Sequence, residues 1–425
     1  MKADMGRRYR AYPTDGQGQV LTRWGHTVRA LWNVALEQRM YLWEQRRYTL
    51  RSAEQCKQLT AGRADLEWLG ELPAQAGQQI LRQLDQAHDN FWNLQAGFPR
   101  RKKRGHRLSI PFPGQAIEIR KLNRKWAEVR LPKLGWLRFR LSRAIGGTVR
   151  NATVSRDGNG WHISFGIHTG RQPGAPNKKL ACGVDFGVAV SAFVSTETTP
   201  RLMPPTLTAN EKNRLKALEQ RRARQLTYAK KHNGGRYSRR LRQTITQIAK
   251  LTARRTNRRR DFTHKLTTDL AKNHGMIGIE DLRVKNMTKT AKGSVETPGK
   301  KVRAKACLNR AILDGTPGER RRQLEYKTRI YGSVLVAVPP FHTSQTCAAC
   351  GLVDPQSRQG CGRLFACTRC GHEDDADHNA SVEIEARARR TSGSDINSTH
   401  SAPRVRVRAS RPRRTREAQR PAHAG

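Results

Sequence analysis

The apolar positions of the chain follow two different periods. From residue 15 to 97, apolar residues such as Leu21, Trp24 and Val28 recur in steps of three and four, which is the period of an amphipathic helix. Residues 7–13 precede this region and end at a proline, which is typical of a short strand. The pattern therefore predicts one strand followed by a small helical subdomain.

The period changes to two between residues 98 and 168, after a basic loop. Residues 136–141 alternate apolar with basic side chains, and the glycines within 157–160 mark the turn of a hairpin. Several short strands separated by turn residues favour a small β-barrel. Its outward basic residues, Arg138 and Arg140, would either face water as an ordinary sheet surface does or line a surface for nucleic acid.

The last region mixes both periods and places acidic residues at the ends of its strands. One apolar strand runs into Asp185 and another runs into Glu280, while the helices between them have arginine-rich outer faces. The expected elements are apolar strands within 180–194, helices within 211–273 that break at 233–235, a strand at 276–279, a helix from 308 to 331 and a strand at 334–338.

The charge of the chain indicates its partner. The 82 Lys and Arg residues against 34 Asp and Glu residues give a net charge of +48. Such an excess repels itself, so a large polyanion is the expected partner. A membrane is not expected, because no apolar run approaches the roughly 18 to 20 residues that span a bilayer. No apolar segment follows the N-terminal charges as in a signal peptide, so we expect a prokaryotic protein of the cytoplasm that is associated with the nucleoid.

Four of the eight cysteines form two Cys-x-x-Cys pairs, and these are Cys347 with Cys350 and Cys367 with Cys370. Two such pairs can surround Zn²⁺ tetrahedrally with thiolates, and the glycine after each pair permits a tight turn. A shell of four thiolates is closed, so this one metal ion would be structural. His372 and Cys361 are rival ligands at a poorer spacing, and we interpret them as ordinary surface or loop residues.

The acidic residues at the strand ends are candidate catalytic groups. Asp185 and Glu280 each end an apolar strand, and Asp374, Asp375 and Asp377 follow the second cysteine pair. Taken alone, such an acid more often forms a turn or an ion pair. Three carboxylates that converge would raise one another's pKa unless divalent cations neutralise them, and two Mg²⁺ ions in such a site hydrolyse phosphodiesters. The order of the elements matches an RNase H-like nuclease core.

Four segments together resemble the signature motifs of the TnpB family, the transposon-encoded, RNA-guided DNA endonucleases related to compact type V CRISPR effectors. The segments are Gly-Val-Asp-Phe-Gly at 183–187, the motif at 279–287 that begins Ile-Glu-Asp-Leu, the first cysteine motif at 343–351 and the second cysteine motif with its acidic continuation at 367–380. The resemblance extends over most of the chain and ends near residue 390.

This resemblance implies specific roles for the candidate residues. The three catalytic acids would be Asp185, Glu280 and Asp377, where Asp377 is selected by the Ala-Asp-x-Asn-Ala match, and they would bind two Mg²⁺ ions. The four paired cysteines would bind the zinc ion. An arginine that assists cleavage would lie near Arg358 or Arg363.

The implied fold is multidomain α+β, with a wedge-type β-barrel that holds a helical recognition insert, followed by an RNase H-like (RuvC) α/β nuclease domain with a zinc-ribbon insert. The expected domains are the first barrel strand at 1–14, the recognition domain at 15–97, the rest of the barrel at 98–175, the nuclease core with a helical hairpin at 176–342, the zinc ribbon at 343–372, the last nuclease segment at 373–390 and a basic disordered tail at 391–425.

We therefore predict an RNA-guided, Mg²⁺-dependent endonuclease that cleaves double-stranded DNA beside a short flanking motif, with a guide RNA and duplex DNA as partners and no membrane. One alternative is an RNA-guided DNA-binding repressor without cleavage, although the three intact acids argue against it. The other is a transposase with an acidic triad. The sequence leaves the guide RNA, the flanking motif and the oligomeric state open.

Overall fold

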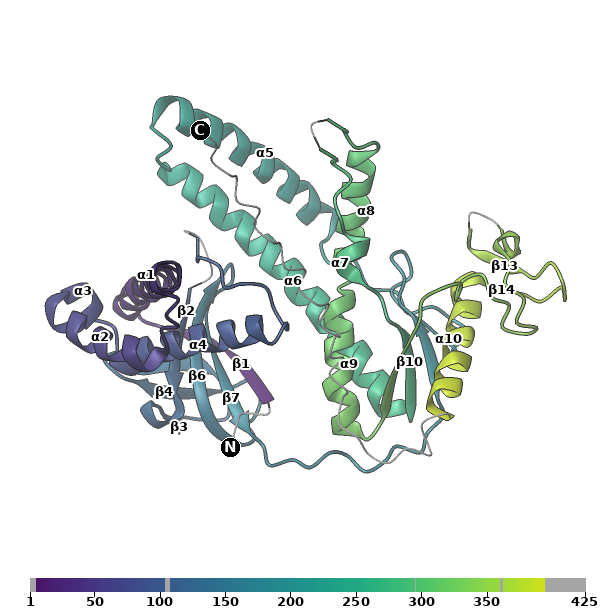
Figure 1. The fold of residues 1–425 in the computed structure, drawn as a ribbon, viewed down its shortest axis with the longest axis horizontal. Coiled ribbons are helices and arrows are strands. Elements are labelled where there is room, and N and C mark those ends of the chain that lie inside the picture. The colour runs from purple at the N-terminus through teal and green to yellow at the C-terminus, as the bar shows by residue number, and fades with distance from the viewer. Residues whose placement is uncertain (1–4, 104–107, 295, 360–361, 394–425) are drawn as a thin grey trace, which may run out of the picture. The chain divides into compact units, whose positions relative to one another are not determined.

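The computed structural model describes residues 5–103, 108–294, 296–359 and 362–393 (Figure 1). These residues divide into two compact units, Met1–Pro173 with Met203–Leu266, and Gly174–Leu202 with Thr267–Gly425. Cys361 and residues 394–425 of the predicted basic tail lie outside the described residues, whereas residues 391–393, which the prediction placed in the tail, are the end of a helix. None of the described helices combines the length and the apolar character needed to cross a lipid bilayer.

The first unit contains a seven-stranded antiparallel sheet in the order β2-β6-β7-β1-β5-β4-β3. Its strands are β1 (Met5–Tyr12), β2 (Ser109–Pro113), β3 (Glu118–Lys121), β4 (Trp126–Leu131), β5 (Gly135–Arg140), β6 (Thr148–Asp157) and β7 (Gly160–His168), with the short 3₁₀ helix η1 (Gly114–Ala116) after β2. β1 pairs first with β7 and then, at Ala11 and Tyr12, with β5, so it joins the two halves of the sheet. Among the described residues, no pairing between β2 and β3 closes the predicted barrel.

One core lies under both halves of this sheet. The rings of Tyr9, Phe139 and Phe165 come from three different strands, and their centroids lie 5.4 to 5.9 Å apart. The predicted hairpin is confirmed, because β6 ends at Asp157 and β7 begins at Gly160. Asp157 Oδ1 accepts the backbone amide of Asn159 at 2.8 Å, which stabilises this turn.

The structure contains helices in the range 15–97, where the sequence predicts them. They are α1 (Asp15–Arg46), α2 (Ser52–Asp65), α3 (Glu67–Gly70) and α4 (Ala74–Trp92). α1 begins at a capping box, in which the side chain of Thr14 accepts the amide of Gln17 and the side chain of Gln17 accepts the amide of Thr14. The buried face of α1 includes Leu21, Trp24 and Val28, as the sequence period predicts.

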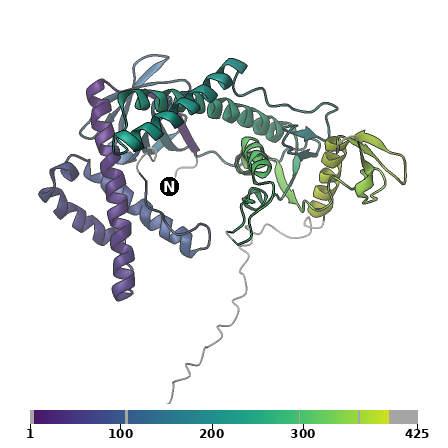
Figure 2. The same ribbon diagram turned by 90° about the horizontal axis from the view of Figure 1, so that it is seen from above.

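Helices α5 (Ala209–His232) and α6 (Arg239–Asn273) form a long hairpin, and Figures 1 and 2 show the two helices side by side. Leu215 and Leu218 of α5 share a small core with Ile248 and Leu251 of α6. The predicted break at 233–235 is confirmed, since two glycines there adopt positive φ angles. Most of α6 belongs to the first unit, and its last residues from Thr267 onward belong to the second.

The second unit is built on a four-stranded sheet in the order β11-β10-β8-β9. Its strands are β8 (Cys182–Asp185), β9 (Phe193–Val194), β10 (Met276–Glu280) and β11 (Val334–Val338), and its helices are α7 (Val284–Met287), α8 (Val302–Asp314), α9 (Pro317–Tyr331) and α10 (Ala376–Gly393). β10 runs parallel to both β8 and β11, whereas β9 is antiparallel to β8.

Two predictions for the second unit are wrong in detail. The predicted helix from 308 to 331 is two helices, because Pro317 lacks an amide hydrogen and disfavours helical backbone at Thr316, which has φ of +51°. The predicted second apolar strand within 180–194 is only two residues long. Because this strand, β9, is so short, it pairs with β8 only at Val184 and Asp185.

Candidate active site and cysteine cluster

The candidate acids Asp185 and Glu280 end neighbouring parallel strands. Val184 of β8 is the register partner of Ile279 of β10, so the next residue of each strand is an acid. The carboxyl ends of parallel strands meet at the same edge of a sheet, which is where open α/β sheets hold their sites. The strand order therefore brings these two predicted residues together.

Two glycines let helix α10 lie directly on these strands. Gly183 of β8 and Gly278 of β10 are register partners. A Cβ atom on Gly183 would lie 2.0 Å from the carbonyl oxygen of Ser381, and one on Gly278 would lie 2.8 Å from Cβ of Ala388. Because side chains do not approach this closely, the packing of α10 requires glycine at Gly183. The first turn of α10, which contains Asp377, is thereby held near the edge with the other two acids.

The three aspartates at the start of α10 have different partners. Asp374 Oδ2 lies 2.6 Å from Nδ1 of His378. Asp375 Oδ1 accepts the backbone amides of Asp377 at 2.9 Å and His378 at 3.3 Å, so it caps the helix. The carboxylate of Asp377 has neither of these roles, and its Oδ1 lies 3.8 Å from Nη2 of Arg358.

Burial and mutual repulsion disfavour the ionised forms of these acids. Burial, followed by the charges of Glu280 and Asp377, raises the pKa of Asp185 from 3.8 to about 7. Burial also raises the pKa of Glu280 and that of Asp377. The charge of Arg358 lowers the pKa of Asp185 and Asp377, and Arg363 acts on Asp377 in the same direction, but neither outweighs burial. This edge of the sheet therefore lacks positive charge, which divalent cations would supply.

The three acids do not form a closed ligand set. Within the ranges that the structure describes, the four paired cysteines are the only group of three or more His, Cys, Asp or Glu residues whose ligand atoms all lie within 4.8 Å of one another. At least one pair of the acids is therefore farther apart than this.

Sequence reasoning missed a threonine and an arginine beside Glu280. Thr343 Oγ1 donates to Glu280 Oε1 at 2.5 Å. This hydrogen bond, and to a smaller extent the charge of Arg387, lowers the pKa of Glu280 against the effect of burial. Thr343 is the first residue of the motif at 343–351. The motif identified this segment as important but did not indicate the contact between Thr343 and Glu280. Arg387 stands in no motif, so no sequence signal identified it.

Asn379 connects α10 to the first cysteine pair. Its side chain is fully buried, its Nδ2 donates to the carbonyl oxygen of Thr346 at 2.8 Å, and its Oδ1 accepts the amide of Ala348 at 2.9 Å. Thr346 and Ala348 flank Cys347, so one side chain on the helix of Asp377 fixes the position of a cysteine ligand. The Asp-x-Asn motif contained this residue, but only the structure shows its contacts.

The predicted metal-binding cysteines meet in one cluster. Sγ of Cys347 lies 3.7 Å from Sγ of Cys370, and Sγ of Cys350 lies 3.6 Å from Sγ of Cys367. Four thiolates around Zn²⁺ at about 2.3 Å would lie about 3.8 Å from one another, so the cluster has the size that this ion requires. His372 is not a member of this cluster, as the sequence predicted.

The two cysteine pairs adopt the same turn. The amide of Gly351 donates to the carbonyl of Cys347 at 2.9 Å, and that of Gly371 donates to the carbonyl of Cys367 at 3.1 Å. The glycines have φ angles of +73° and +72°, which confirms the prediction that they permit tight turns. A small antiparallel sheet surrounds the cluster, with the 3₁₀ helix η2 (Pro355–Ser357) and strands β12 (Arg358–Gln359), β13 (Leu364–Ala366) and β14 (Glu373–Asp375).

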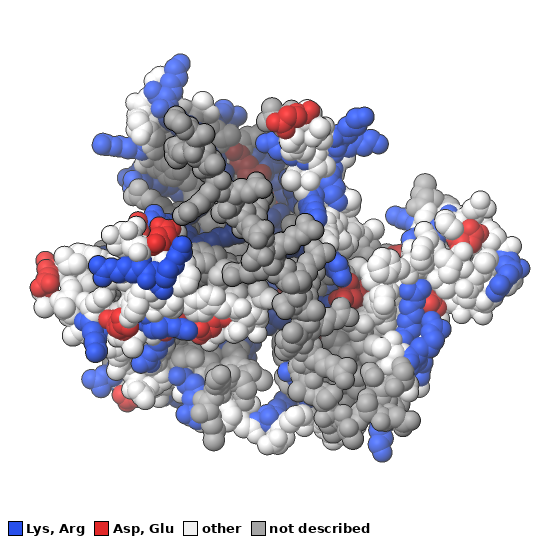
Figure 3. Space-filling model, in the orientation of Figure 1, with Lys and Arg blue, Asp and Glu red and all other residues white. Residues whose placement is uncertain are grey.

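Basic side chains are distributed over the surface, and on the face drawn in Figure 3 most charged side chains are Lys or Arg. Arg138 and Arg140 project from β5, and their guanidinium carbons lie 4.9 and 5.1 Å from the ring centroid of Trp126. A guanidinium stacked on an aromatic ring is held in a fixed orientation but keeps its charge. The structure therefore puts these two predicted residues on one outer surface of the sheet.

The α5–α6 hairpin carries arginines of two kinds. Arg254 and Arg258 of α6 both pair with Glu211 of α5. Exposed arginines of α5 that form no ion pair with any residue in the described part of the chain include Arg221, Arg222 and Arg224, which lie close together in the middle of the helix. Their charge is available to an anionic partner.

Three segments of the chain match known protein families. Residues 164–291 match a family described as a probable transposase, and residues 318–384 match a Cas12f1-like TNB domain. Residues 1–47 match a helix-turn-helix domain, and the described part of this segment contains β1 and α1.

Similar proteins cover most of the chain. A putative RNA-guided DNA endonuclease of Escherichia coli (strain K12), InsQ, is 39% identical over 76% of this chain and 76% of its own length. A putative RNA-guided DNA endonuclease of Streptomyces pristinaespiralis is 32% identical over 89% of this chain and 88% of its own length. A solved Cas12f1–sgRNA–target DNA complex aligns with 88% of this chain and 83% of its own chain, at 14% identity and a TM-score of 0.49.

Proposed function

Because the chain belongs to the TnpB family, whose members are relatives of the type V CRISPR effectors, we propose that it is an RNA-guided endonuclease that cleaves double-stranded DNA. A guide RNA would pair with one DNA strand, while the protein recognises a short flanking motif and the shape of the backbone. It would act on DNA in the cytoplasm of a prokaryote. The observation that best supports cleavage is the convergence of Asp185 and Glu280 at one sheet edge, with Asp377 on the helix packed against it.

We propose that Asp185, Glu280 and Asp377 hold two Mg²⁺ ions. The donor set fits these ions, because Mg²⁺ prefers carboxylate oxygens. Burial, followed by the charges of Glu280 and Asp377, raises the pKa of Asp185 to about 7, and a bound cation would favour its ionised form. Bound Mg²⁺ would lower the pKa of an attacking water and stabilise the leaving oxygen. Asp375 caps α10 and so orients Asp377, while Thr343 orients Glu280. Arg358, near Asp377, is our candidate for an arginine that contacts the cleaved phosphate.

We propose that the four clustered cysteines hold one structural Zn²⁺. The sulfur spacing supports this proposal, and four thiolates leave no open position for a substrate. Asn379 would hold the zinc ribbon in a fixed position against α10, because its side chain forms hydrogen bonds with the backbone on both sides of Cys347.

The functional domains that we propose follow the sequence boundaries. They are a wedge barrel (1–14 and 98–175), a recognition domain (15–97), a RuvC core with its helical hairpin (176–342), a zinc ribbon (343–372), a last RuvC segment (373–390) and a basic tail (391–425). The parallel arrangement of β8, β10 and β11 supports an RNase H-like core. The arginines of β5 and of the α5–α6 hairpin are our candidates for contacts with phosphates.

Reconstitution tests this function. The protein is purified with its bound RNA, the RNA is sequenced, and matched duplexes with a randomised flank are supplied with Mg²⁺. We expect cleavage of duplexes that contain a discrete flanking motif. Asp185→Ala should lower the rate on the order of 10³-fold, because several kcal/mol of transition-state stabilisation would be lost, and should leave binding intact. A wild-type complex that leaves every matched duplex uncut contradicts the proposal.

The same material distinguishes the alternatives. A repressor would bind the duplex with and without Asp185→Ala and cut it in neither case. The match of residues 164–291 to a probable transposase favours assaying strand joining as well. Joined products formed without RNA would support a transposase instead.

A further inference from the structure

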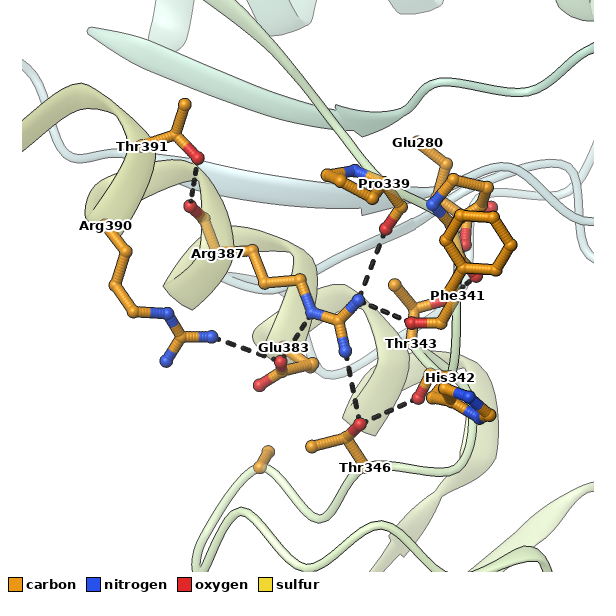
Figure 4. Close-up of polar contacts among 12 residues, drawn as sticks. Glu280, Pro339, Phe341, His342, Thr343, Thr346, Glu383, Arg387, Arg390 and Thr391 are labelled. Carbon is orange, nitrogen blue, oxygen red and sulfur yellow. Dashed lines mark hydrogen bonds and ion pairs between the residues drawn. The ribbon is translucent and has the colours of Figure 1, made fainter. Parts of the chain in front are cut away.

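Arg387 connects helix α10 to the segment that links β11 with the cysteine cluster (Figure 4). Its Nη1 donates to the carbonyl oxygens of Pro339 at 3.2 Å and Phe341 at 2.6 Å, and its Nη2 lies 3.2 Å from Thr346 Oγ1. Its Nε donates to Glu383 Oε1 at 2.7 Å, one helical turn earlier. One guanidinium therefore fixes both ends of this linking segment against the helix.

The segment held by Arg387 contains a residue that contacts a proposed catalytic acid. Thr343 is only 4% exposed, and its hydroxyl donates to Glu280 at 2.5 Å. Thr346, which also contacts Arg387, donates to the carbonyl oxygen of His342 at 2.7 Å. Arg387 therefore holds the chain on both sides of Thr343. It contacts the carbonyl groups of Pro339 and Phe341 before Thr343, and the side chain of Thr346 after it.

These contacts exceed what a surface ion pair needs. The neighbouring Arg389 pairs with Glu385 one turn earlier, and its side chain is 56% exposed. Arg387 makes the equivalent pair with Glu383, but its side chain is 19% exposed and it has three further partners outside the helix. The same helix thus contains one arginine with only the ion pair and one arginine with the additional contacts.

We propose that Arg387 is a positioning residue for Glu280. It fixes residues 339–346 so that Thr343 holds the Glu280 carboxylate in the orientation that binds a divalent cation. The charge of Arg387 acts weakly on Glu280 from a distance, but among the described contacts its hydrogen bonds reach the Glu280 carboxylate only through the segment that holds Thr343. This inference rests on the proposed nuclease function.

The test compares Arg387→Ala and Thr343→Val with Arg389→Ala, a matched control on the same helix. For each RNA-loaded protein we measure the Mg²⁺ concentration that gives half-maximal cleavage, and the affinity for the target duplex without Mg²⁺. Partners that orient metal ligands contribute roughly 10- to 100-fold to metal affinity. We expect both variants to need about tenfold more Mg²⁺ with unchanged duplex affinity, and we expect Arg389→Ala to match the wild type.

A double variant and conservative substitutions test whether Arg387 acts on Glu280 through Thr343. If Arg387 acts through Thr343, the double variant needs no more Mg²⁺ than the more impaired single variant. Thr343→Ser keeps the hydroxyl and should restore the wild-type requirement. Arg387→Lys keeps the charge but lacks the three nitrogens that reach the two carbonyl groups, Thr346 and Glu383 together, so it should remain impaired. Additive effects, or full rescue by Arg387→Lys, would overturn the inference.

Hydrogen exchange without Mg²⁺ gives a readout independent of cleavage. In Arg387→Ala, the amides of residues 341–346 should exchange roughly tenfold faster, with those of β8 and β10 unchanged. Faster exchange throughout the second unit would assign Arg387 to general stability and overturn the inference. An unchanged Mg²⁺ requirement in Arg387→Ala would also overturn the inference about Arg387, but it would leave the proposed nuclease function intact. A wild-type complex that does not cleave would contradict the proposed function itself, so the two failures are distinguishable.

Discussion

Among single residues, Asp185 shows how a metal site affects the protein before any ion binds. Its pKa is raised from 3.8 to about 7, first by burial and then by Glu280 and Asp377. As the pH rises from about 4 to about 7, the unfolded chain loses this proton while the folded protein keeps it. The contribution of Asp185 therefore lowers the stability of the metal-free protein across this window, and the loss persists at higher pH.

Asp185→Asn removes this charge and keeps the shape of the side chain. In zinc-loaded protein without Mg²⁺, we expect the variant to melt a few degrees above the wild type at pH 8, because a neutral amide avoids the cost of a buried charge. The difference should shrink toward pH 4, where Asp185 is protonated in the folded protein. Scanning calorimetry over a series of pH values measures this.

Asp65→Asn, an exposed position on α2, is the control for this measurement and should follow the wild type at every pH. Mg²⁺ should raise the melting temperature of the wild type at pH 8 and have a much smaller effect on Asp185→Asn, because ligand binding stabilises only a protein that retains the site. An Asp185→Asn variant that melts below the wild type at pH 8 would show that the charge of Asp185 is not costly.

At the scale of secondary-structure elements, the site depends on direct contact between a helix and two strands. Gly183 and Gly278 leave room for the backbone and small side chains of α10. Ser195 adds a connection, because its hydroxyl accepts the amide of Gly183 at 2.9 Å and donates to Glu385 of α10 at 2.5 Å. The position of Asp377 relative to β8 follows from this packing.

Gly183→Ala should push α10 away from β8. The added Cβ would meet backbone atoms of Ser381 and Glu385, which cannot rotate away. Overpacking of this kind costs about 1 to 3 kcal/mol, and we expect the upper end of that range in denaturant unfolding, with at least tenfold slower cleavage. Gly6→Ala in β1, where no atom lies within 4 Å of the added Cβ, should be nearly neutral. Equal effects of the two substitutions would argue against this account of the packing.

Removing the zinc ion should unfold the ribbon. Strands β12, β13 and β14 have two or three residues each, and the small core between them is formed largely by the cysteines themselves, so metal binding would supply most of the folding free energy. We expect Cys367→Ser to lose the single zinc ion and to expose residues 343–375 to hydrogen exchange, while the parallel sheet stays protected. Cys307→Ser, an exposed cysteine of α8, should keep its zinc. Full zinc content in Cys367→Ser would refute the assignment of the ligands.

The sequence predicted best those elements and sites whose signal is local. The helical period of α1, the glycines at the hairpin turn and the spacing of the four cysteines each depend on residues close together in the chain. The break at Pro317 was also local, because Gly315, Pro317 and Gly318 mark it, but the prediction of one helix did not use these residues. Arg387, Thr343 and Asn379 have their partners across tertiary contacts, which no periodicity reveals.

At the scale of the whole molecule, the net charge of +48 makes phosphate contact the dominant interaction with a partner. Acidic side chains compensate only part of this charge. On the α5–α6 hairpin, Glu211 is shared by Arg254 and Arg258, whereas Arg221, Arg222 and Arg224 are exposed without an ion pair among the described residues. An arginine already paired with an acid gains less from a phosphate than an unpaired one.

Neutralising the unpaired arginines should therefore change the salt dependence of duplex binding more than neutralising the paired ones. Each phosphate contact contributes about 0.9 to the slope of log K against log salt concentration. Changing Arg221, Arg222 and Arg224 together to Gln should lower the slope by about 2 to 3, whereas Arg254→Gln with Arg258→Gln should lower it by less than about 1 for the two sites together. Equilibrium binding of the RNA-loaded protein to matched DNA over a salt series measures both. If the triple variant keeps the wild-type slope, the outer face of α5 does not contact phosphates, and the excess charge must act through other surfaces such as β5.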